Sequence, residues 1–144
     1  MFFGILAVLC AGFFAGAAAY ISLVQQPAAR TLGTAGAVRF FGPMYARAAP
    51  FQASLALIGT LSALVSCSLG NGWLWLIGAV CLVAVVPFTL VVIKPTNDRL
   101  KDPGLDGSSE EANRLLGRWS GLHALRIGAS IVAFVIFVIA LARI

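Results

Sequence analysis

Residues 118–142 read RWSGLHALRIGASIVAFVIFVIALA, and the run from Ile127 to Ala142 contains no charged residue. Stretches of the same kind recur along the chain, which is 60% hydrophobic and 10% charged. Soluble domains carry about 25% charged residues. The composition therefore indicates that the solvent for most of this chain is a lipid bilayer.

Four apolar stretches are long enough to cross a membrane, at about residues 2–25, 50–69, 73–93 and 123–142. A crossing helix needs about 20 apolar residues, and backbone polar groups in lipid must be satisfied within their own segment. The sequence therefore predicts an all-α integral membrane protein, a single domain over 1–144 that forms an antiparallel up-down four-helix bundle. The first stretch lacks the basic start of a signal peptide, which favours a retained helix over a cleaved one.

Basic residues are concentrated in two of the connections. Arg30, Arg39 and Arg47 fall in the first, and Lys94, Arg99, Lys101, Arg114 and Arg118 fall in the last. Short loops rich in Lys and Arg stay in the cytoplasm. We expect both termini outside the cytoplasm, in a plasma or inner membrane. This asymmetry also explains the net charge of +5, and no nucleic-acid-binding motif accompanies it.

The connections on the basic side read as loops. Residues 25–49 are expected to form a long loop, with the aromatic residues of 40–45 at headgroup depth. Pro43 and Pro50 are candidate helix starts. Residues 96–101, TNDRLK, are expected to form a short polar turn.

The last two helices carry local signals of their own. Pro87 lies within the third apolar stretch and predicts a kink, because proline has no N–H to donate; Thr89 is available to satisfy the freed carbonyl. Ser108 and Glu111 have the spacing of a capping box. The fourth helix is therefore expected to begin near residue 109, as a cytoplasmic extension of the span.

Trp119, His123 and Arg126 have i, i+4, i+7 spacing and share one helical face. His123 is the only histidine. A charge inside a membrane is costly and indicates a partner or a wet cavity, and Asp98 is the expected partner of Arg126. The alternative interpretation is a set of interface anchors, with the arginine reaching to the headgroups.

Other polar residues are expected at the same depth and on other helices. They are Tyr20, Gln26, Tyr45, Gln52, Thr89 and Asn97. Tyr20 and Gln52 are alternative hydrogen-bond partners for Arg126. Together these residues could line a pocket that opens toward the cytoplasm, where an imidazole exchanges a proton near neutral pH.

Several kinds of site are disfavoured by the residues present. One histidine and no carboxylate within the apolar stretches do not make a metal shell, and a catalytic triad lacks its acid. Cys10, Cys67 and Cys81 show no CxxC spacing. We expect no metal and no other cofactor.

Four motifs, in order, give the chain a resemblance to a known family. They are GAAAYISLVQQPAAR (16–30), YARAAPFQASLALI (45–58), PFTLVVIKPTNDRL (87–100) and RWSGLHALR (118–126). On these motifs the chain resembles the DUF1772 family, also called the anthrone oxygenase family. The resemblance implies a small integral membrane four-helix bundle.

The resemblance also implies a chemistry. Some fungal members oxidise anthrones to anthraquinones without a metal or a flavin. His123 would then be the base that removes a proton from a substrate carbon, while Asn97, Trp119 and Arg126 would stabilise the enolate oxygen or shape the pocket. Where many members carry a His-Pro pair, this chain has Gln26-Pro27, which removes a second imidazole.

Two functions therefore remain open from the sequence. The first is an oxygenase-like enzyme acting on a small anthrone-like or quinone-like aromatic, bound by Tyr20, Gln26, Tyr45, Gln52 and Thr89. The second is a non-catalytic accessory subunit of a larger membrane complex, or a homo-oligomer, that associates through the small residues repeated along the first helix. A carrier would need an oligomer of four-helix chains.

Overall fold

The computed structural model describes residues 1–143, and it contains helices and no strand in that range. Four helical stretches are long and apolar enough to cross a membrane: Phe2–Arg30, Gly33–Ser68, Leu74–Leu100 and Glu110–Leu141. The all-α four-helix prediction is confirmed. Such a set of helices is compatible with an integral multi-pass membrane protein.

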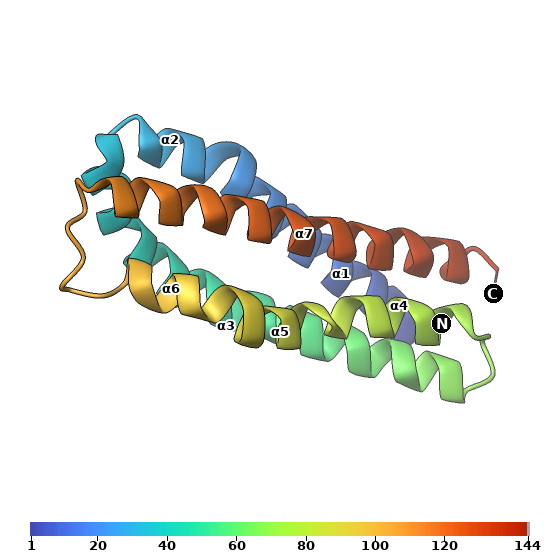
Figure 1. The fold of residues 1–144 in the computed structure, drawn as a ribbon. Helices are drawn as coiled ribbons and strands as arrows, with labels where there is room; N and C mark the ends of the chain where they lie inside the picture. Colours follow the sequence, from blue (N-terminus) through green and yellow to red (C-terminus); the bar gives the residue numbers. More distant parts are fainter. Residues whose placement is uncertain (144) are drawn as a thin grey trace.

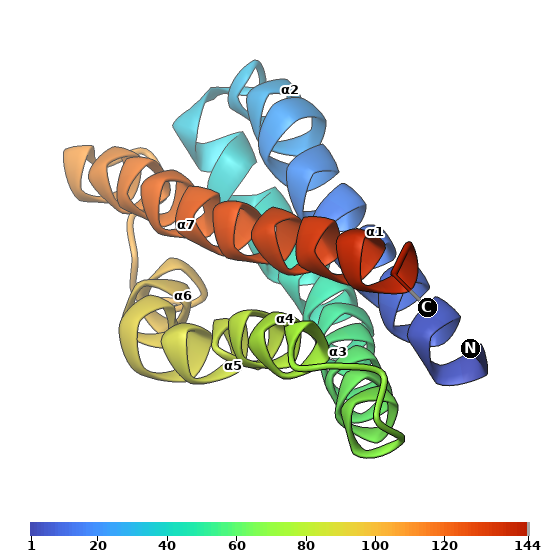
Figure 2. The same ribbon diagram turned by 90° about the vertical axis from the view of Figure 1, so that its right-hand side faces the viewer.

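The four stretches are built from seven α-helices and two π-helical turns. In chain order they are α1 (Phe2–Tyr20), a π turn (Ile21–Gln25), α2 (Gln26–Arg30), α3 (Gly33–Ser68), α4 (Leu74–Val83), α5 (Val85–Phe88), a π turn (Thr89–Ile93), α6 (Lys94–Leu100) and α7 (Glu110–Leu141). The long helices form a ring in which α1 packs on α3, α3 on α4, α4 on α7 and α7 on α1 (Figures 1 and 2). Both termini lie at one end of the bundle (Figure 1).

The expected loop at 25–49 is wrong, because that segment is almost entirely helical. Only Thr31 and Leu32 separate α2 from α3, and Gly33 turns the chain with a φ of +80°. Pro43 and Pro50 lie inside α3. These prolines disfavour a helix locally, but α3 continues through them because its additional turns bury side chains against α7 and α2.

Each of the two π turns precedes a proline. Pro27 is the second residue of α2 and Pro95 the second residue of α6. A proline ring clashes with the carbonyl four residues earlier, and a wider turn relieves that clash without ending the helix. The expected polar turn at 96–101 is for this reason wrong, since α6 continues the third stretch to Leu100.

The kink predicted near Pro87 corresponds to a one-residue interruption of the helix, since α4 ends at Val83 and α5 begins at Val85. Thr89 Oγ1 donates to the carbonyl oxygen of Val85 at 2.6 Å. The proline instead frees the carbonyl of Val83, four residues before it. The expectation that Thr89 satisfies the freed carbonyl is therefore wrong, because its hydroxyl bonds a carbonyl two residues further along the chain.

The start of α7 lies one residue from the predicted capping box. Ser109 is the N-cap, and its hydroxyl accepts from the Ala112 amide at 3.1 Å. Arg99 donates to Glu111 at 2.8 Å and to Asp102 at 2.7 Å, which ties α6 to the start of α7. Hydrogen bonds from the Gly104 amide and from Arg99 hold the pKa of Asp102 below its ordinary value.

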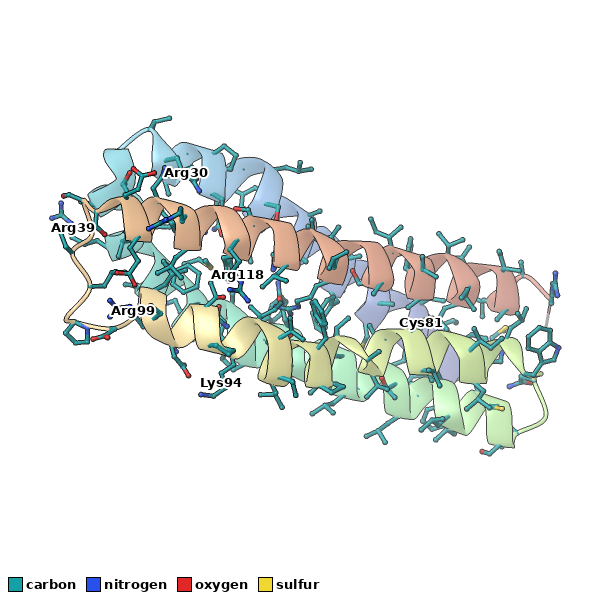
Figure 3. The ribbon with its side chains drawn as sticks, viewed as in Figure 1. Arg30, Arg39, Cys81, Lys94, Arg99 and Arg118 are labelled. Atoms are coloured by element: carbon teal, nitrogen blue, oxygen red, sulfur yellow. The ribbon has the colours of Figure 1, made fainter. Side chains whose placement is uncertain are left out.

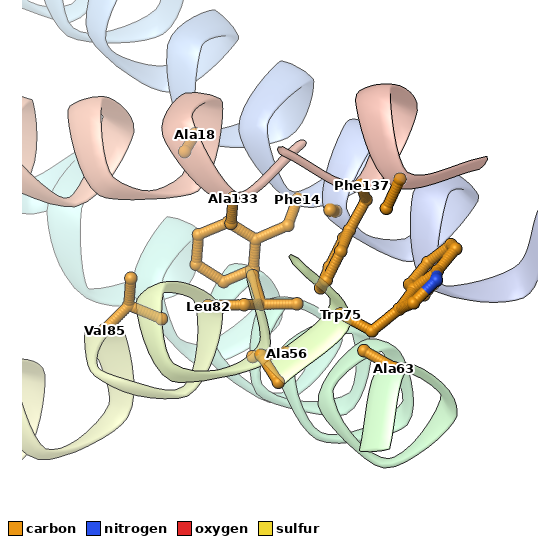
Figure 4. Close-up of a cluster of buried hydrophobic side chains, with 13 residues drawn as sticks. Phe14, Ala18, Ala56, Ala63, Trp75, Leu82, Val85, Ala133 and Phe137 are labelled. Carbon is orange, nitrogen blue, oxygen red and sulfur yellow. The ribbon is translucent and has the colours of Figure 1, made fainter. Parts of the chain in front are cut away.

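The half of the bundle nearer the termini holds an apolar core of small and aromatic residues. Trp75 and Phe137 stack with ring centroids 5.6 Å apart (Figure 4). A Cβ added at Gly78 would clash with the Phe137 ring. Here α4 and α7 therefore approach closely only because that position has no side chain.

Candidate functional site

Arg126 is a buried cation inside the bundle. Its side chain is directed toward α3, where Nη2 donates to Gln52 Oε1 at 2.9 Å, and its guanidinium lies 5.4 Å from the centre of the Phe14 ring. The residue is 9% exposed. It forms no ion pair with any acid of residues 1–143. The Nε atom is also buried without a hydrogen-bond partner in that range.

The depth of Arg126 makes this arrangement unusual. Fifteen residues separate it from Leu141, where α7 ends, so it lies about 22 Å along the helix from that end. The hydrocarbon of a bilayer is about 30 Å thick. A guanidinium at that depth is expensive without compensation, and the Gln52 oxygen and the Phe14 ring provide part of it.

The expected partner of Arg126 was Asp98, and that prediction is wrong. Asp98 is bonded to Lys94, four residues before it on the same helix, and Lys101 lies 3.7 Å from its other oxygen. Gln52, one of the two alternatives, takes its place. The cation consequently has no counter-charge within the described chain.

His123 lies one turn before Arg126 and is 1% exposed. Its Nε2 is 3.2 Å from the carbonyl oxygen of Ala18 in α1. Because a carbonyl only accepts, Nε2 carries the proton and Nδ1 holds a free lone pair. Nδ1 is buried, with no hydrogen-bond partner among residues 1–143.

An aromatic stack fixes the orientation of this imidazole. The ring of Trp119 lies parallel to it with centroids 4.5 Å apart. Phe41 of α3 meets Trp119 edge to face at 5.3 Å and stacks on Tyr45 at 5.8 Å. These contacts join α3 and α7 around the histidine, so its ring cannot turn freely.

Three cavities surround these residues. The α1–α3 cavity, about 650 Å³, is bordered by Tyr20 and Gln52 among others. The α3–α5 cavity, about 290 Å³, is bordered by Phe14, Tyr45, Thr89 and Arg126 among others. The α5–α7 cavity, about 280 Å³, also reaches Arg126. The guanidinium and its bond to Gln52 thus lie between the two larger cavities.

The remaining predicted site residues are buried away from these cavities. Gln26 and Asn97 are 4% and 0% exposed, and both amide atoms of each side chain have no partner among residues 1–143. Neither residue lines any of the three cavities, and neither do Trp119 and His123. Buried amides are normally hydrogen-bonded, so the unpaired amides of Gln26 and Asn97 are exceptions to that rule.

The structure therefore brings some of the predicted residues together and separates others. Arg126 and Gln52 are in contact, and Trp119 and His123 are in contact beside them. Tyr20 is 54% exposed on the outside of α1, away from the histidine stack. Sequence reasoning missed Phe14 and the Ala18 carbonyl, because an aromatic ring and a backbone oxygen in an apolar helix carry no local signal.

The charged side chains lie away from this interior. Arg30, Arg39, Lys94, Arg99 and Arg118 all lie in the half of the bundle opposite the termini (Figure 3). Within residues 1–143, no group of three His, Cys, Asp or Glu side chains is placed to hold a metal ion. The polar groups at the site are consequently one imidazole, one guanidinium and neutral amide, hydroxyl and indole groups.

Comparison with known proteins assigns the chain to a family. A family model described as anthrone oxygenase matches residues 41–136, a range that includes Gln52, Asn97, Trp119, His123 and Arg126. The anthrone oxygenase tpcL of Aspergillus fumigatus is 30% identical over 130 residues, which cover 83% of this chain and 81% of the relative. No solved structure matches the chain. The chain belongs to the anthrone oxygenase family.

Proposed function

We propose that this protein is an oxygenase-like membrane enzyme that oxidises a small electron-rich aromatic of the anthrone or quinone-like class, with His123 as the base. Family membership supports an oxygenase-like role, and the relative's name supplies the substrate class. The observation that carries the proposal is the free Nδ1 of His123. It is a buried proton acceptor whose tautomer is set by the Ala18 carbonyl.

The chemistry begins with removal of a proton. An anthrone has an activated CH₂ group opposite its carbonyl, so loss of one proton to Nδ1 of His123 leaves an enolate. The electron-rich carbon then reacts with O₂. One oxygen atom is retained as the new carbonyl, the other leaves as water with the two hydrogens of the CH₂ group, and His123 returns to its neutral form. No metal or flavin is required in this sequence of steps.

Arg126 is the group that would stabilise the enolate oxygen. It borders the α3–α5 cavity, where Phe14 and Tyr45 offer aromatic walls and Thr89 a hydroxyl. A cation held in a dry site stabilises a developing oxyanion strongly. His123 is three residues from Arg126, about 4.5 Å along the helix. That offset suits a substrate whose oxygen and acidic carbon lie on opposite sides of one ring.

Access to His123 requires a side-chain movement, since the imidazole does not line the cavity. The bond between Arg126 and Gln52 lies between the two larger cavities, so its opening would join them and free the side chain of Arg126, three residues from His123, to move. Substrate binding would exchange that bond for one to the enolate oxygen. Asn97 and Gln26, with unpaired amides in the same half of the bundle, are further candidates to bind polar groups of the substrate.

The proposed orientation follows from charge. We propose that the end of the bundle rich in Lys and Arg lies in the cytoplasm and both termini outside it, in a plasma or inner membrane, because segments rich in Lys and Arg are retained. Tyr45, Ala49 and Pro50 line the α3–α5 cavity in the half of α3 that carries Arg39 and Arg47, so its opening would face the cytoplasmic side of the membrane.

The test is turnover of an anthrone by the purified protein in lipid nanodiscs. His123→Gln keeps an amide that can donate to the Ala18 carbonyl and removes the base. We expect a fall of about 10²-fold or more in the rate above the protein-free reaction. Ser130→Ala is the matched control, because Ser130 is buried on the same face and bonds only its own helix. Turnover by His123→Gln at the wild-type rate would favour the accessory-subunit function instead.

A further inference from the structure

The α1–α3 cavity shares only Gln52 with the chemistry proposed above. It lies between α3 and the end of α1 with its following π turn, and its volume is about 650 Å³. Gly16, Tyr20 and Arg47 at its edge are exposed, so the cavity is open to the surroundings of the bundle. Among residues 1–143, Arg47 is the one charged residue that lines it.

If one face of the hydrocarbon lies at the start of α1 and the end of α3, the cavity crosses the opposite boundary between hydrocarbon and headgroups. Arg47 lies 21 residues from Ser68, the end of α3, which is about 31 Å along the helix and equals the thickness of the hydrocarbon. Tyr20 lies 18 residues from Phe2, at about 27 Å. Gly16 and Phe51 lie further inside. One end of the cavity thus carries Arg47 at phosphate depth. The other end, lined by Gly16 and Phe51 together with the amide of Gln52, lies at acyl-chain depth.

We propose that this cavity binds one phospholipid with an anionic headgroup, its phosphate on Arg47 and an acyl chain along Gly16 and Phe51. No acid lines the cavity, and Arg47 forms no ion pair with an acid of residues 1–143. Arginine pairs with phosphate oxygens through parallel hydrogen bonds. Basic pockets between membrane helices on the side of the basic loops are typical binding sites for anionic headgroups.

The charge part of the proposal is tested by native mass spectrometry of the detergent-solubilised protein with phosphatidylglycerol and, separately, phosphatidylcholine. The wild type is expected to retain phosphatidylglycerol preferentially, and Arg47→Gln to lose about fivefold in that binding. Arg39→Gln is the matched control. It removes one exposed cation from the same helix, about 12 Å further from the bilayer core, and Arg39 does not line the cavity.

The shape part is tested by filling the cavity. A Cβ at Gly16 would meet nothing within 4 Å, so Gly16→Leu adds bulk to the cavity without a core clash. Gly128, equally open but outside the cavity, gives the control Gly128→Leu. We expect Gly16→Leu alone of these two to reduce lipid retention.

Three results would overturn the proposal. The first is unchanged retention in Arg47→Gln or Gly16→Leu, and the second is an equal loss in the control variants. The third is displacement of the lipid by millimolar inorganic phosphate, which would show an anion site that needs no acyl chain. Retention is measured without turnover, so this test is independent of the proposed enzymatic reaction.

Discussion

The bond between Arg126 and Gln52 should be an energetically coupled pair, and a double-mutant cycle measures that coupling. Gln52→Leu removes the 2.9 Å bond and leaves a buried guanidinium with no polar partner among residues 1–143. A hydrogen bond to a charged group contributes about 1.5–3 kcal/mol, and an orphaned partner costs that much or more. Arg126→Met removes the charge and leaves the Gln52 amide unpaired, at a cost of about 1–3 kcal/mol.

The double variant should be less destabilised than the sum of the two singles. Replacing both partners by apolar groups of similar shape is nearly neutral, so we expect a coupling of at least about 1.5 kcal/mol. Reversible unfolding in mixed micelles, followed by circular dichroism, supplies the free energies. The pair Gln52→Leu with Ser130→Ala is the control and should be additive. Additivity within about 0.5 kcal/mol for the Arg126 cycle would refute the contact.

Two further predictions concern the packing and the start of the last helix. Gly78→Ala makes a Cβ clash with the Phe137 ring and should lower stability by about 1–3 kcal/mol, whereas Gly128→Ala, in open space, should not. Equal unfolding midpoints for the two variants in the same assay would contradict the close approach of α4 and α7. Ser109→Ala removes the N-cap and should cost about 1 kcal/mol, while Ser108→Ala should cost little, and a larger loss for Ser108→Ala would restore the capping box predicted from sequence.

The four membrane-crossing helices were predictable because hydropathy is a local property of about 20 residues. The helical course of residues 26–49 was not, since Pro43 and Pro50 are local breakers whose tolerance depends on packing. Phe41 was misplaced for the same reason. It reads as an interfacial aromatic in the sequence and is fully buried against Trp119 in the structure.

The candidate site was predictable only in part, for similar reasons. Helical spacing placed Trp119, His123 and Arg126 on one face, and the structure turns that face inward. The partner of Arg126 could not be chosen from depth alone. Lys94, one turn before Asp98 on the same helix, competes for the carboxylate, and an intrahelical pair forms without any tertiary alignment. The separation of His123 from the cavities depends on side-chain packing, which no sequence pattern encodes.

The central claim is that His123 accepts a proton from a substrate carbon, and anaerobic hydrogen exchange measures that step alone. The protein is incubated in D₂O, without O₂, with an anthrone, and deuterium at the CH₂ group is followed by NMR. We predict exchange well above the protein-free rate for the wild type and for Ser130→Ala, and exchange at the protein-free rate for His123→Gln. Equal exchange by wild type and His123→Gln would contradict the role of this imidazole as the base.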